Sequence, residues 1–386
     1  MDRFDAIVVG AGPAGSSAAL TLARAGMTVA ILDSAVFPRE KLCGGLLSRR
    51  TEKLFRAHFG DSWQNAVIQE AAGASFYSGS SLVRSIDGYS RLYLTSRSLF
   101  DQHLVTLACR AGARFLQQSA VKDVDVAACQ VRLADGRNYG AKFLIGCDGA
   151  NSRIAKALGT RGRKRSQMAV GLEINLPAAE VKRPVTLPEI YFGVVKWGYG
   201  WVFPKRDCLT VGVGGLTGQN PDMKEVFFRF LADVCGRLPD VTPKGHPIPY
   251  NNFTRNPGRG NVLLAGDAAG LVEPITGEGI AFAIQSGRIA AESVLTAAGN
   301  GRPCDSAKLY RQNLREIFRL FRYASVMRLL VFPRQTQRLF LSVLARSETP
   351  ARKFLDLLAD EIEYSDYAKF IVGRLAGRPL RAAKGG

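Results

Sequence analysis

The sequence predicts an α/β protein with a parallel sheet, an inserted antiparallel β-sheet and a helical C-terminal region. Three observations support this prediction. Short apolar runs end in a glycine/aspartate turn at three widely separated places, which is typical of parallel strands buried on both faces. Residues 71–96 and 161–254 have the alternation and turn residues of antiparallel strands. Residues 301–386 alternate leucine and phenylalanine with arginine, which favours helices.

The composition is that of a globular chain. It has 386 residues, 47% of them hydrophobic and 22% charged, so it can bury a substantial core. This length predicts roughly two to three structural units. No apolar run approaches the ~20 residues of a membrane span, and the first five residues lack the pattern of a signal peptide. We therefore expect a cytoplasmic protein, with peripheral contact at the inner face of the membrane left open.

The chain is strongly basic, with 52 Lys and Arg against 33 Asp and Glu and a formal net charge of +19. An anionic membrane surface or an anionic ligand accounts for this excess, and so does a solvated basic surface. Nucleic acid is disfavoured, because the basic residues are spread along the chain without a zinc spacing or an RNA-binding box. The seven cysteines form no CxxC pair, so neither a metal site nor a disulfide framework is expected.

The N-terminal segment has the pattern of a dinucleotide-binding turn. An apolar strand at residues 6–9 leads into the glycine-rich residues 10–15, and an alanine-rich helix follows. A second strand at residues 28–32 ends in an acid at the distance expected of a ribose-binding residue. Glycines let the backbone approach a pyrophosphate, and the helix N-terminus attracts its charge. The expected dinucleotide contacts are Gly10, Gly12, Ala14, Gly15 and Asp33.

Further elements follow in order. They are a helix from Arg97 with its cap near Ser96, strands at 142–148, 190–193, 209–214 and 261–267, and a long helix from Gly277. The strands at 142–148 and 261–267 end in Asp148 and Asp267, each next to a glycine. Since the carboxyl ends of parallel strands meet at one edge of a sheet, both acids are expected near the dinucleotide turn.

Together, the three strand-and-turn segments resemble the FAD-binding fold of the flavoprotein hydroxylases and their reductase relatives. In that fold the second turn lies near the flavin and the nicotinamide path, and the aspartate of the third turn binds the flavin ribityl chain. The resemblance therefore implies that Asp148 and Asp267 contact FAD. The N–H groups of Gly279 and Ile280 would face the flavin pyrimidine or the pyrophosphate, and Val121 is also expected to contact the cofactor.

Two more segments restrict the resemblance to one family among these flavoproteins. Residues 38–45, PREKLCGG, resemble the KxCGG stretch of the geranylgeranyl reductase family. Residues 199–204, YGWVFP, are followed after seven residues by the GVG of residues 212–214, which resembles that family's YxWxFP…GxG signature. Five motifs in the family's order make the chain similar to these FAD-dependent oxidoreductases. The resemblance implies a Rossmann-like FAD-binding domain, non-covalently bound FAD, and NAD(P)H or a ferredoxin-like protein as electron donor.

The resemblance also implies an activity, in which reduced flavin saturates C=C bonds of a prenyl (geranylgeranyl-type) chain. The partner would then be an isoprenoid or another apolar small molecule. Tyr199, Trp201 and Phe203 alternate along a strand, so they share one face and would line an apolar slot for that chain. Ordinary core packing of the three rings stays open as the alternative.

The resemblance also implies that three further residues lie near the flavin. Cys43 and Gly44 match positions close to the isoalloxazine, and Cys43 is a candidate proton donor or carbocation stabiliser, because alkene reduction needs a proton as well as a hydride. A plain buried cysteine is the alternative. Arg97 matches the family's arginine near the flavin phosphates, with an exposed i,i+4 ion pair to Asp101 as the alternative.

The chain is expected to divide into three regions. These are a discontinuous FAD-binding domain at residues 1–70, 97–160 and 255–300, a substrate domain at 71–96 and 161–254, and a C-terminal helical region at 301–386. In the last region Arg315, Arg319 and Arg322 share one helical face beside apolar residues. Such a basic amphipathic helix can lie on an anionic membrane, and packing onto the FAD-binding domain is the alternative.

Other flavoprotein functions remain open. A monooxygenase that hydroxylates an aromatic ring shares the fold, although the KxCGG and YxWxFP segments disfavour it. A halogenase would carry a WxWxIP box, whereas Tyr199 and Phe203 stand here in place of the first Trp and the Ile. A non-enzymatic electron-transfer flavoprotein usually carries an iron–sulfur cysteine cluster, and this sequence has none.

Overall fold

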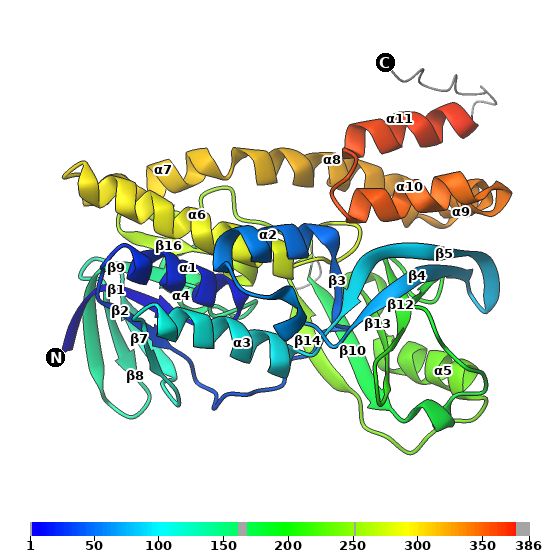
Figure 1. Ribbon diagram of the computed structural model, residues 1–386, viewed down its shortest axis with the longest axis horizontal. Coiled ribbons are helices and arrows are strands. Elements are labelled where there is room, and N and C mark those ends of the chain that lie inside the picture. The colour runs from blue at the N-terminus through cyan, green and yellow to red at the C-terminus, as the bar shows by residue number, and fades with distance from the viewer. Residues whose placement is uncertain (1, 161–167, 251, 376–386) are drawn as a thin grey trace.

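The computed structural model describes residues 2–160, 168–250 and 252–375. The parts of the expected regions at 161–167, 251 and 376–386 lie outside these residues. Two eight-stranded sheets lie next to each other along the long axis of the molecule, and helices cover them (Figure 1). The predicted α/β class, with a parallel sheet, an antiparallel sheet and C-terminal helices, is confirmed.

The first sheet is mostly parallel. Its strands are β1 (Asp2–Val9), β2 (Val29–Leu32), β6 (Arg114–Leu116), β7 (Val121–Asp125), β8 (Gln130–Leu133), β9 (Asn138–Gly146), β15 (Gly258–Arg259) and β16 (Val262–Leu264). The order is β15-β16-β9-β1-β2-β6, and the hairpin β7–β8 joins β9. Because β16, β9, β1, β2 and β6 pair in parallel, their C-terminal ends meet at one edge.

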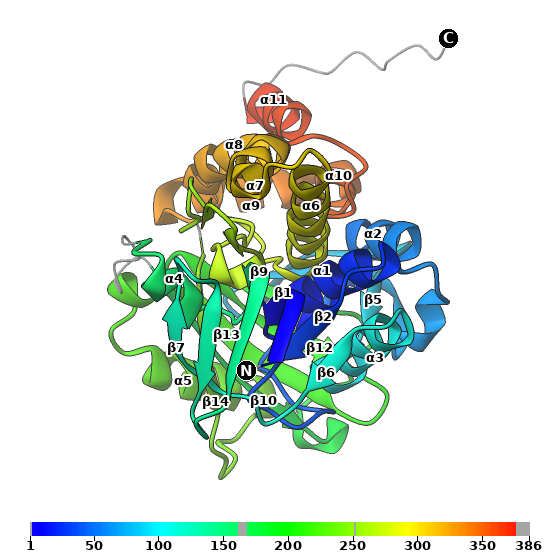
Figure 2. The ribbon, with the colours of Figure 1, turned by 90° about the vertical axis from the view of Figure 1, so that its left-hand side faces the viewer.

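Helices bury both faces of this sheet. They are α1 (Pro13–Arg24), α2 (Arg49–Phe59), α3 (Arg97–Arg110), α4 (Arg153–Ala157), α6 (Ile280–Gly299) and α7 (Ser306–Asn313). Figure 2 shows α1 and α3 on one side of the sheet and the β7–β8 hairpin on the other. Ile7 and Val8 on β1 are fully buried as a result. The side chain of Ser96 caps α3 by accepting a hydrogen bond from the N–H of Leu99 at 3.2 Å, as predicted.

The second sheet is antiparallel except for one parallel pair, β11 with β4. Its strands are β3 (Leu46–Ser48), β4 (Gln69–Ser78), β5 (Ser81–Leu94), β10 (Ala169–Leu176), β11 (Glu189–Phe192), β12 (Gly198–Pro204), β13 (Leu209–Leu216) and β14 (Lys244–Ile248). The order is β14-β10-β13-β12-β11-β4-β5-β3. The described short 3-10 turns are η1 (Trp63–Asn65), η3 (Ala178–Glu180), η4 (Thr217–Gln219), η5 (Gly266–Ala268) and η6 (Pro303–Asp305).

Helices cover this sheet on both sides. Helix α5 (Met223–Cys235) packs on one face, where Phe227 meets Val202 and Val211 in one apolar core. The C-terminal helices lie on the opposite side in Figure 1, and they are α8 (Arg315–Val331), α9 (Arg334–Arg346), α10 (Glu348–Leu358) and α11 (Tyr364–Leu375). Phe76 on β4 shares a second core with Phe354 on α10. Among the described helices, none is both long and apolar enough to cross a bilayer.

Three predicted boundaries are wrong. The strand predicted at 142–148 is β9, Asn138–Gly146, which ends two residues before Asp148. The long helix begins at Ile280, not at Gly277, because the side chain of Glu273 accepts hydrogen bonds from the N–H groups of Ile275 and Thr276 and holds this segment as a loop. Gly277 in that loop has a φ of 72°, which a helix does not allow. The strand predicted at 261–267 is shorter, since the chain turns into η5 at Gly266.

Candidate functional site

One large cavity lies where the C-terminal edge of the first sheet meets the second sheet. Its volume is about 1220 Å³, and it is lined by the turns after β1, β2, β9 and β16 and by residues of β12 and β14. All but one of the residues singled out from the sequence line it: Gly10, Gly12, Ala14, Asp33, Cys43, Gly44, Arg97, Val121, Asp148, Tyr199, Trp201, Phe203, Asp267, Gly279 and Ile280. The exception is Gly15. A Cβ atom there would lie 1.8 Å from the carbonyl oxygen of Gly10, so this glycine allows α1 to approach the turn.

The turn after β1 leaves open space in front of the N-terminus of α1. Gly10 has a φ of 100°, and the backbone of Cys147 leaves no room for a Cβ atom there. The two carboxylate oxygens of Asp33 accept the N–H groups of Ala11 at 2.8 Å and of Ala35 at 2.9 Å, which fixes the turn. A Cβ atom on Gly12 would approach no neighbouring atom closer than 3.7 Å. The helix N-terminus therefore faces a space that an anion can enter.

Arg97 forms the ion pair with Asp101 that the sequence allowed, but the pair is buried, not exposed. Nε and Nη2 of Arg97 donate to the two carboxylate oxygens at 2.8 and 2.6 Å, and Asp101 is 0% exposed. Arg39 Nη2 lies 2.9 Å from the same carboxylate. Burial alone would lower the pKa of Arg97, but Asp101 outweighs it and raises that pKa. Two guanidinium groups thus share one carboxylate beside Gly12.

The acids of the other two turns have different surroundings. Asp148 accepts hydrogen bonds from the Ser152 hydroxyl at 2.5 Å and from the N–H of Arg153 at 2.7 Å, while burial raises its pKa. Asp267 pairs with Lys41 Nζ at 3.1 Å. Burial favours protonated Asp267, but Lys41 and the nearby Arg97 outweigh it and lower the pKa of Asp267. Asp267 is therefore an ionised hydrogen-bond acceptor at neutral pH.

Cys43 lies between the two sheets. Its N–H donates to Glu173 Oε1 on β10 at 2.8 Å, and burial raises the pKa of Glu173. The neighbouring Gly44 packs against the aromatic residues: a Cβ atom there would lie 2.7 Å from the ring of Phe203. Cys43 itself lines the cavity, next to the glycine that packs against Phe203.

The aromatic residues of β12 fit into gaps left by two glycines of β13. In the antiparallel register Trp201 is opposite Gly212, and Tyr199 is opposite Gly214. A Cβ atom on Gly212 would lie 2.4 Å from Trp201 Cζ2, so the indole occupies the space of the missing side chain. This register explains the seven-residue spacing between the YGWVFP and GVG segments. Trp201 and Phe203 are each 6% exposed and line the cavity wall, so core packing of these rings is observed together with a position at the cavity.

A loop before α6 is held against this wall. The Tyr199 hydroxyl donates to the carbonyl oxygen of Thr276, and the Tyr250 hydroxyl donates to that of Ile275 at 3.0 Å. Glu273 is fully buried and accepts the N–H and hydroxyl of Thr276, and burial raises its pKa. These contacts place Gly279 and the first N–H groups of α6 at the cavity.

Sequence reasoning missed several residues of the site, namely Lys41, Glu173, His246, Tyr250 and Glu273. An acid inside an apolar strand, as in the AVGLEINL segment of β10, was the available signal for Glu173. Lys41 is the lysine of the KxCGG segment, but its pairing with Asp267 spans 226 residues and no local window shows it. Glu273 caps residues only two and three positions away, and its burial gave no signal in the sequence.

The comparisons with known proteins agree with this geometry. The FAD binding domain family model matches residues 3–194. A chloroplastic geranylgeranyl diphosphate reductase of Oryza sativa is 31% identical over 83% of this chain and 72% of the relative. A menaquinone reductase of Mycobacterium tuberculosis is 31% identical over 75% of this chain and 76% of the relative. The chain belongs to the geranylgeranyl reductase family of FAD-dependent oxidoreductases.

Solved structures share the fold of this family member. A geranylgeranyl bacteriochlorophyll reductase-like protein from Thermoplasma acidophilum superimposes with a TM-score of 0.76 and 24% identity, over 98% of this chain and 97% of the other. A flavin-dependent brominase superimposes with a TM-score of 0.68 and 15% identity, over 97% of this chain and 100% of the other. At these identities the likeness shows the fold alone, and it does not distinguish reduction from halogenation.

The site fits the FAD that the family requires. Arg39 Nη1 and His246 Nε2 are buried polar atoms without a hydrogen-bond partner among the described residues, and both residues line the cavity. The open space at Gly12, with two guanidinium groups and the N-terminus of α1 beside it, suits a pyrophosphate. The ionised Asp267 suits hydroxyl donors such as those of a ribityl chain. Polar groups otherwise left unpaired would thus find partners in a bound dinucleotide.

Proposed function

We propose that this family member reduces C=C bonds of a prenyl chain of the geranylgeranyl type. The observation that carries the proposal is one continuous cavity: the same space touches Gly12 and Asp267 at the dinucleotide turns and Trp201 at the aromatic wall. An apolar chain in contact with the aromatic wall would lie next to the flavin. The names of the relatives, which include geranylgeranyl diphosphate reductases, support this choice.

In this proposal the dinucleotide turns bind and orient FAD. The contacts are Gly10, Gly12, Ala14, Asp33, Cys43, Gly44, Arg97, Val121, Asp148, Asp267, Gly279 and Ile280, with Gly15 supporting the turn from behind. Reduced FAD, when bound, supplies the hydride that alkene reduction needs. Tyr199, Trp201 and Phe203 hold the prenyl chain and exclude water from it. Electrons come from NAD(P)H or a ferredoxin-like protein.

We assign the proton to Cys43. Hydride addition to one alkene carbon requires a proton on the other. Cys43 is a thiol that lines the cavity beside the aromatic wall. The S–H bond breaks as the new C–H bond forms, and solvent then reprotonates the thiolate. General acid catalysis of this kind contributes about 10²–10⁴-fold. Cys43→Ala should therefore slow prenyl reduction by about that factor while the flavin is still photoreduced normally.

The decisive experiment is anaerobic. The FAD-loaded protein is photoreduced, geranylgeranyl diphosphate or a prenylated quinone is added, and flavin absorbance is followed together with product mass. Reoxidation without oxygen, with a product heavier by two hydrogens per bond, is the expected result. A flavin that stays reduced until air is admitted, and then hydroxylates or halogenates an aromatic compound, would contradict the proposal.

A further inference from the structure

One face of α8 changes character along its length. Arg315, Arg319 and Arg322 are followed by Tyr323, Val326 and Leu329, and at 3.6 residues per turn all six fall on one side of the helix. The three apolar side chains are 50%, 68% and 53% exposed. We call these six residues the α8 outer face. Its first half is basic and its second half is apolar.

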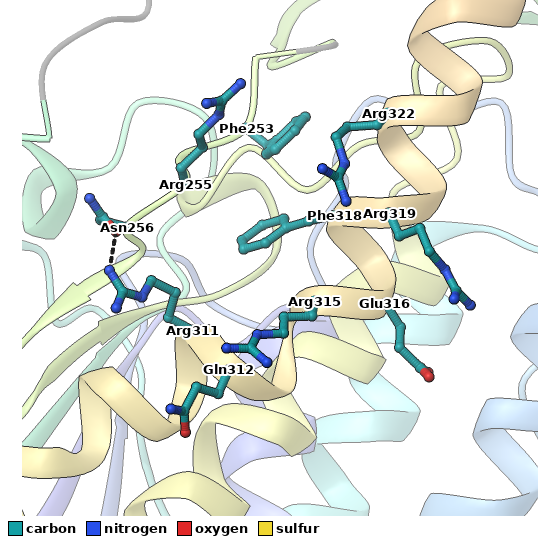
Figure 3. Close-up of a pocket in the computed structure, with 10 residues that line it drawn as sticks. All are labelled: Phe253, Arg255, Asn256, Arg311, Gln312, Arg315, Glu316, Phe318, Arg319 and Arg322. Atoms are coloured by element: carbon teal, nitrogen blue, oxygen red, sulfur yellow. Dashed lines mark hydrogen bonds between the residues drawn. The ribbon is translucent and has the colours of Figure 1, made fainter.

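The basic half borders a groove with further arginines. This cavity of about 650 Å³ lies between the α7–α8 corner and the loop around Arg255, and Arg311 also lines it. Figure 3 shows Arg311, Arg315 and Arg322 around the phenylalanine pair at its centre, while Arg319 and Glu316 point away. The pair, Phe253 and Phe318, is stacked with ring centroids 5.4 Å apart.

The positive charge in this groove is not balanced within the protein. Arg311 donates to Asn256 Oδ1 at 3.1 Å, a neutral acceptor. Among the described residues, none of the five arginines of the groove lies within 4.0 Å of a carboxylate oxygen. Elsewhere in the chain, arginines such as Arg50 and Arg97 are paired with acids. Uncompensated guanidinium groups of this kind favour an anionic partner.

A dissolved anion would account for the arginines but not for the exposed apolar residues beside them. An anionic bilayer accounts for both, since its phosphates attract guanidinium groups and its acyl boundary accepts Val326 and Leu329. We propose that the α8 outer face docks the protein on an anionic lipid bilayer, with the basic half at the headgroups and the apolar half inserted into the interface.

The docking face lies on the same helix as a contact to the cavity. Arg328 on α8 stacks over Trp197 at 4.8 Å and over Tyr250 at 5.4 Å, and both aromatic residues line the large cavity. A protein docked through α8 therefore has only the thickness of this helix between the bilayer and the cavity wall. The use of this arrangement as a route for a membrane-borne prenyl substrate rests on the proposed function. The docking itself does not depend on that function.

The first test measures vesicle binding by the FAD-loaded full-length protein. Phosphatidylcholine vesicles are compared with vesicles that contain phosphatidylglycerol, at low and high salt. Each arginine near an anionic surface contributes about fivefold to the partition coefficient, so neutralising three should weaken binding on the order of 100-fold. The variant is Arg315→Gln/Arg319→Gln/Arg322→Gln. The matched control, Lys224→Gln/Arg229→Gln/Arg237→Gln on and just beyond α5, removes the same charge from exposed positions and should bind normally.

A fluorescent probe tests the apolar half directly. Val326→Trp should shift its emission to the blue with anionic vesicles, whereas Leu238→Trp, at a similarly exposed site beyond α5, should not. Absence of vesicle binding at low salt, or equal weakening by both triple variants, would overturn the docking proposal. Saturable binding of inorganic phosphate in the groove without vesicle binding would also overturn it. Turnover of a detergent-solubilised prenyl substrate is measured separately, so loss of turnover with intact docking would count against the proposed function alone.

Discussion

Trp201 packs against two glycines of β13, Gly212 and Gly214, and the two contacts predict different losses of stability on substitution. A Cβ atom on Gly212 would lie 2.4 Å from Trp201 Cζ2 and 2.8 Å from the carbonyl oxygen of Leu172, so both ring and backbone would have to move. A Cβ atom on Gly214 would lie 3.2 Å from Trp201 Cζ3 and no closer than 3.6 Å to any other described neighbour, and a small ring movement relieves the one tight contact. Overpacking of a filled core costs about 1–3 kcal/mol, while replacing a strand glycine with alanine recovers about 0.5–1 kcal/mol. Gly212→Ala should therefore destabilise the protein by about 1–2 kcal/mol, and Gly214→Ala should be close to neutral.

A Cβ atom on Gly212 pushes the indole away from β13, and Trp201 lines the cavity. Gly212→Ala should therefore also raise the KM for a prenyl substrate, with a smaller effect on kcat. Urea unfolding followed by circular dichroism gives the stability, and anaerobic flavin reoxidation gives the kinetics. Gly214→Ala is the matched control, one strand repeat away on the same face. Equal stability of the two variants, or a larger loss for Gly214→Ala, would refute the reasoning from the register.

Three further predictions concern buried polar contacts. Asp101→Asn leaves the buried guanidinium of Arg97 without its counter-charge and should cost about 3–5 kcal/mol in the apoprotein, measured by urea unfolding, with a smaller loss once FAD is bound. His58 is half-buried, and desolvation lowers its pKa to about 4, so the unfolded chain binds its proton first. Stability should therefore fall by up to about 3 kcal/mol as pH drops from 6.5 to 4. His58→Asn should flatten that part of the curve, and an unchanged slope would contradict the assignment. Tyr199→Phe removes the hydrogen bond to Thr276 and should lower the free energy of unfolding by about 1 kcal/mol. FAD should also be retained more weakly, as measured by equilibrium dialysis. Unchanged Trp201 fluorescence is the control.

Local patterns predicted the parts of the site that depend on neighbouring residues. The turn at Gly10 and Gly12, and the acids at strand ends such as Asp267, follow from a few consecutive residues, and the structure brings them to one cavity. Gly15 was included among the cofactor contacts, although the third glycine of this motif is also expected to permit close packing of helix and strand. Its missing side chain serves the contact of α1 with Gly10.

The parts that were missed depend on pairing between distant strands and on side chains that cap a loop. The role of Gly212 follows from its register with Trp201, which no local window shows. The start of α6 is set by Glu273, whose side chain competes with the helix for backbone N–H groups. Arg97 shows a third limit: the i,i+4 pair was foreseen, but its burial depends on how the rest of the chain packs around it.

The shared core of the second sheet and the C-terminal helices has a consequence for how the chain folds during synthesis. The hydroxyl of Tyr89 on β5 donates to Asp356 on α10, 267 residues further along the chain, and Phe76 packs on Phe354. Until α9 and α10 have left the ribosome, the apolar face of β4 and β5 lacks the helices that cover it. Contacts of such long sequence separation form slowly, and apolar strands that wait for a partner are prone to aggregation. Packing of the C-terminal helices on the second sheet therefore completes folding. A chain shortened before α10 should depend on chaperones to stay soluble.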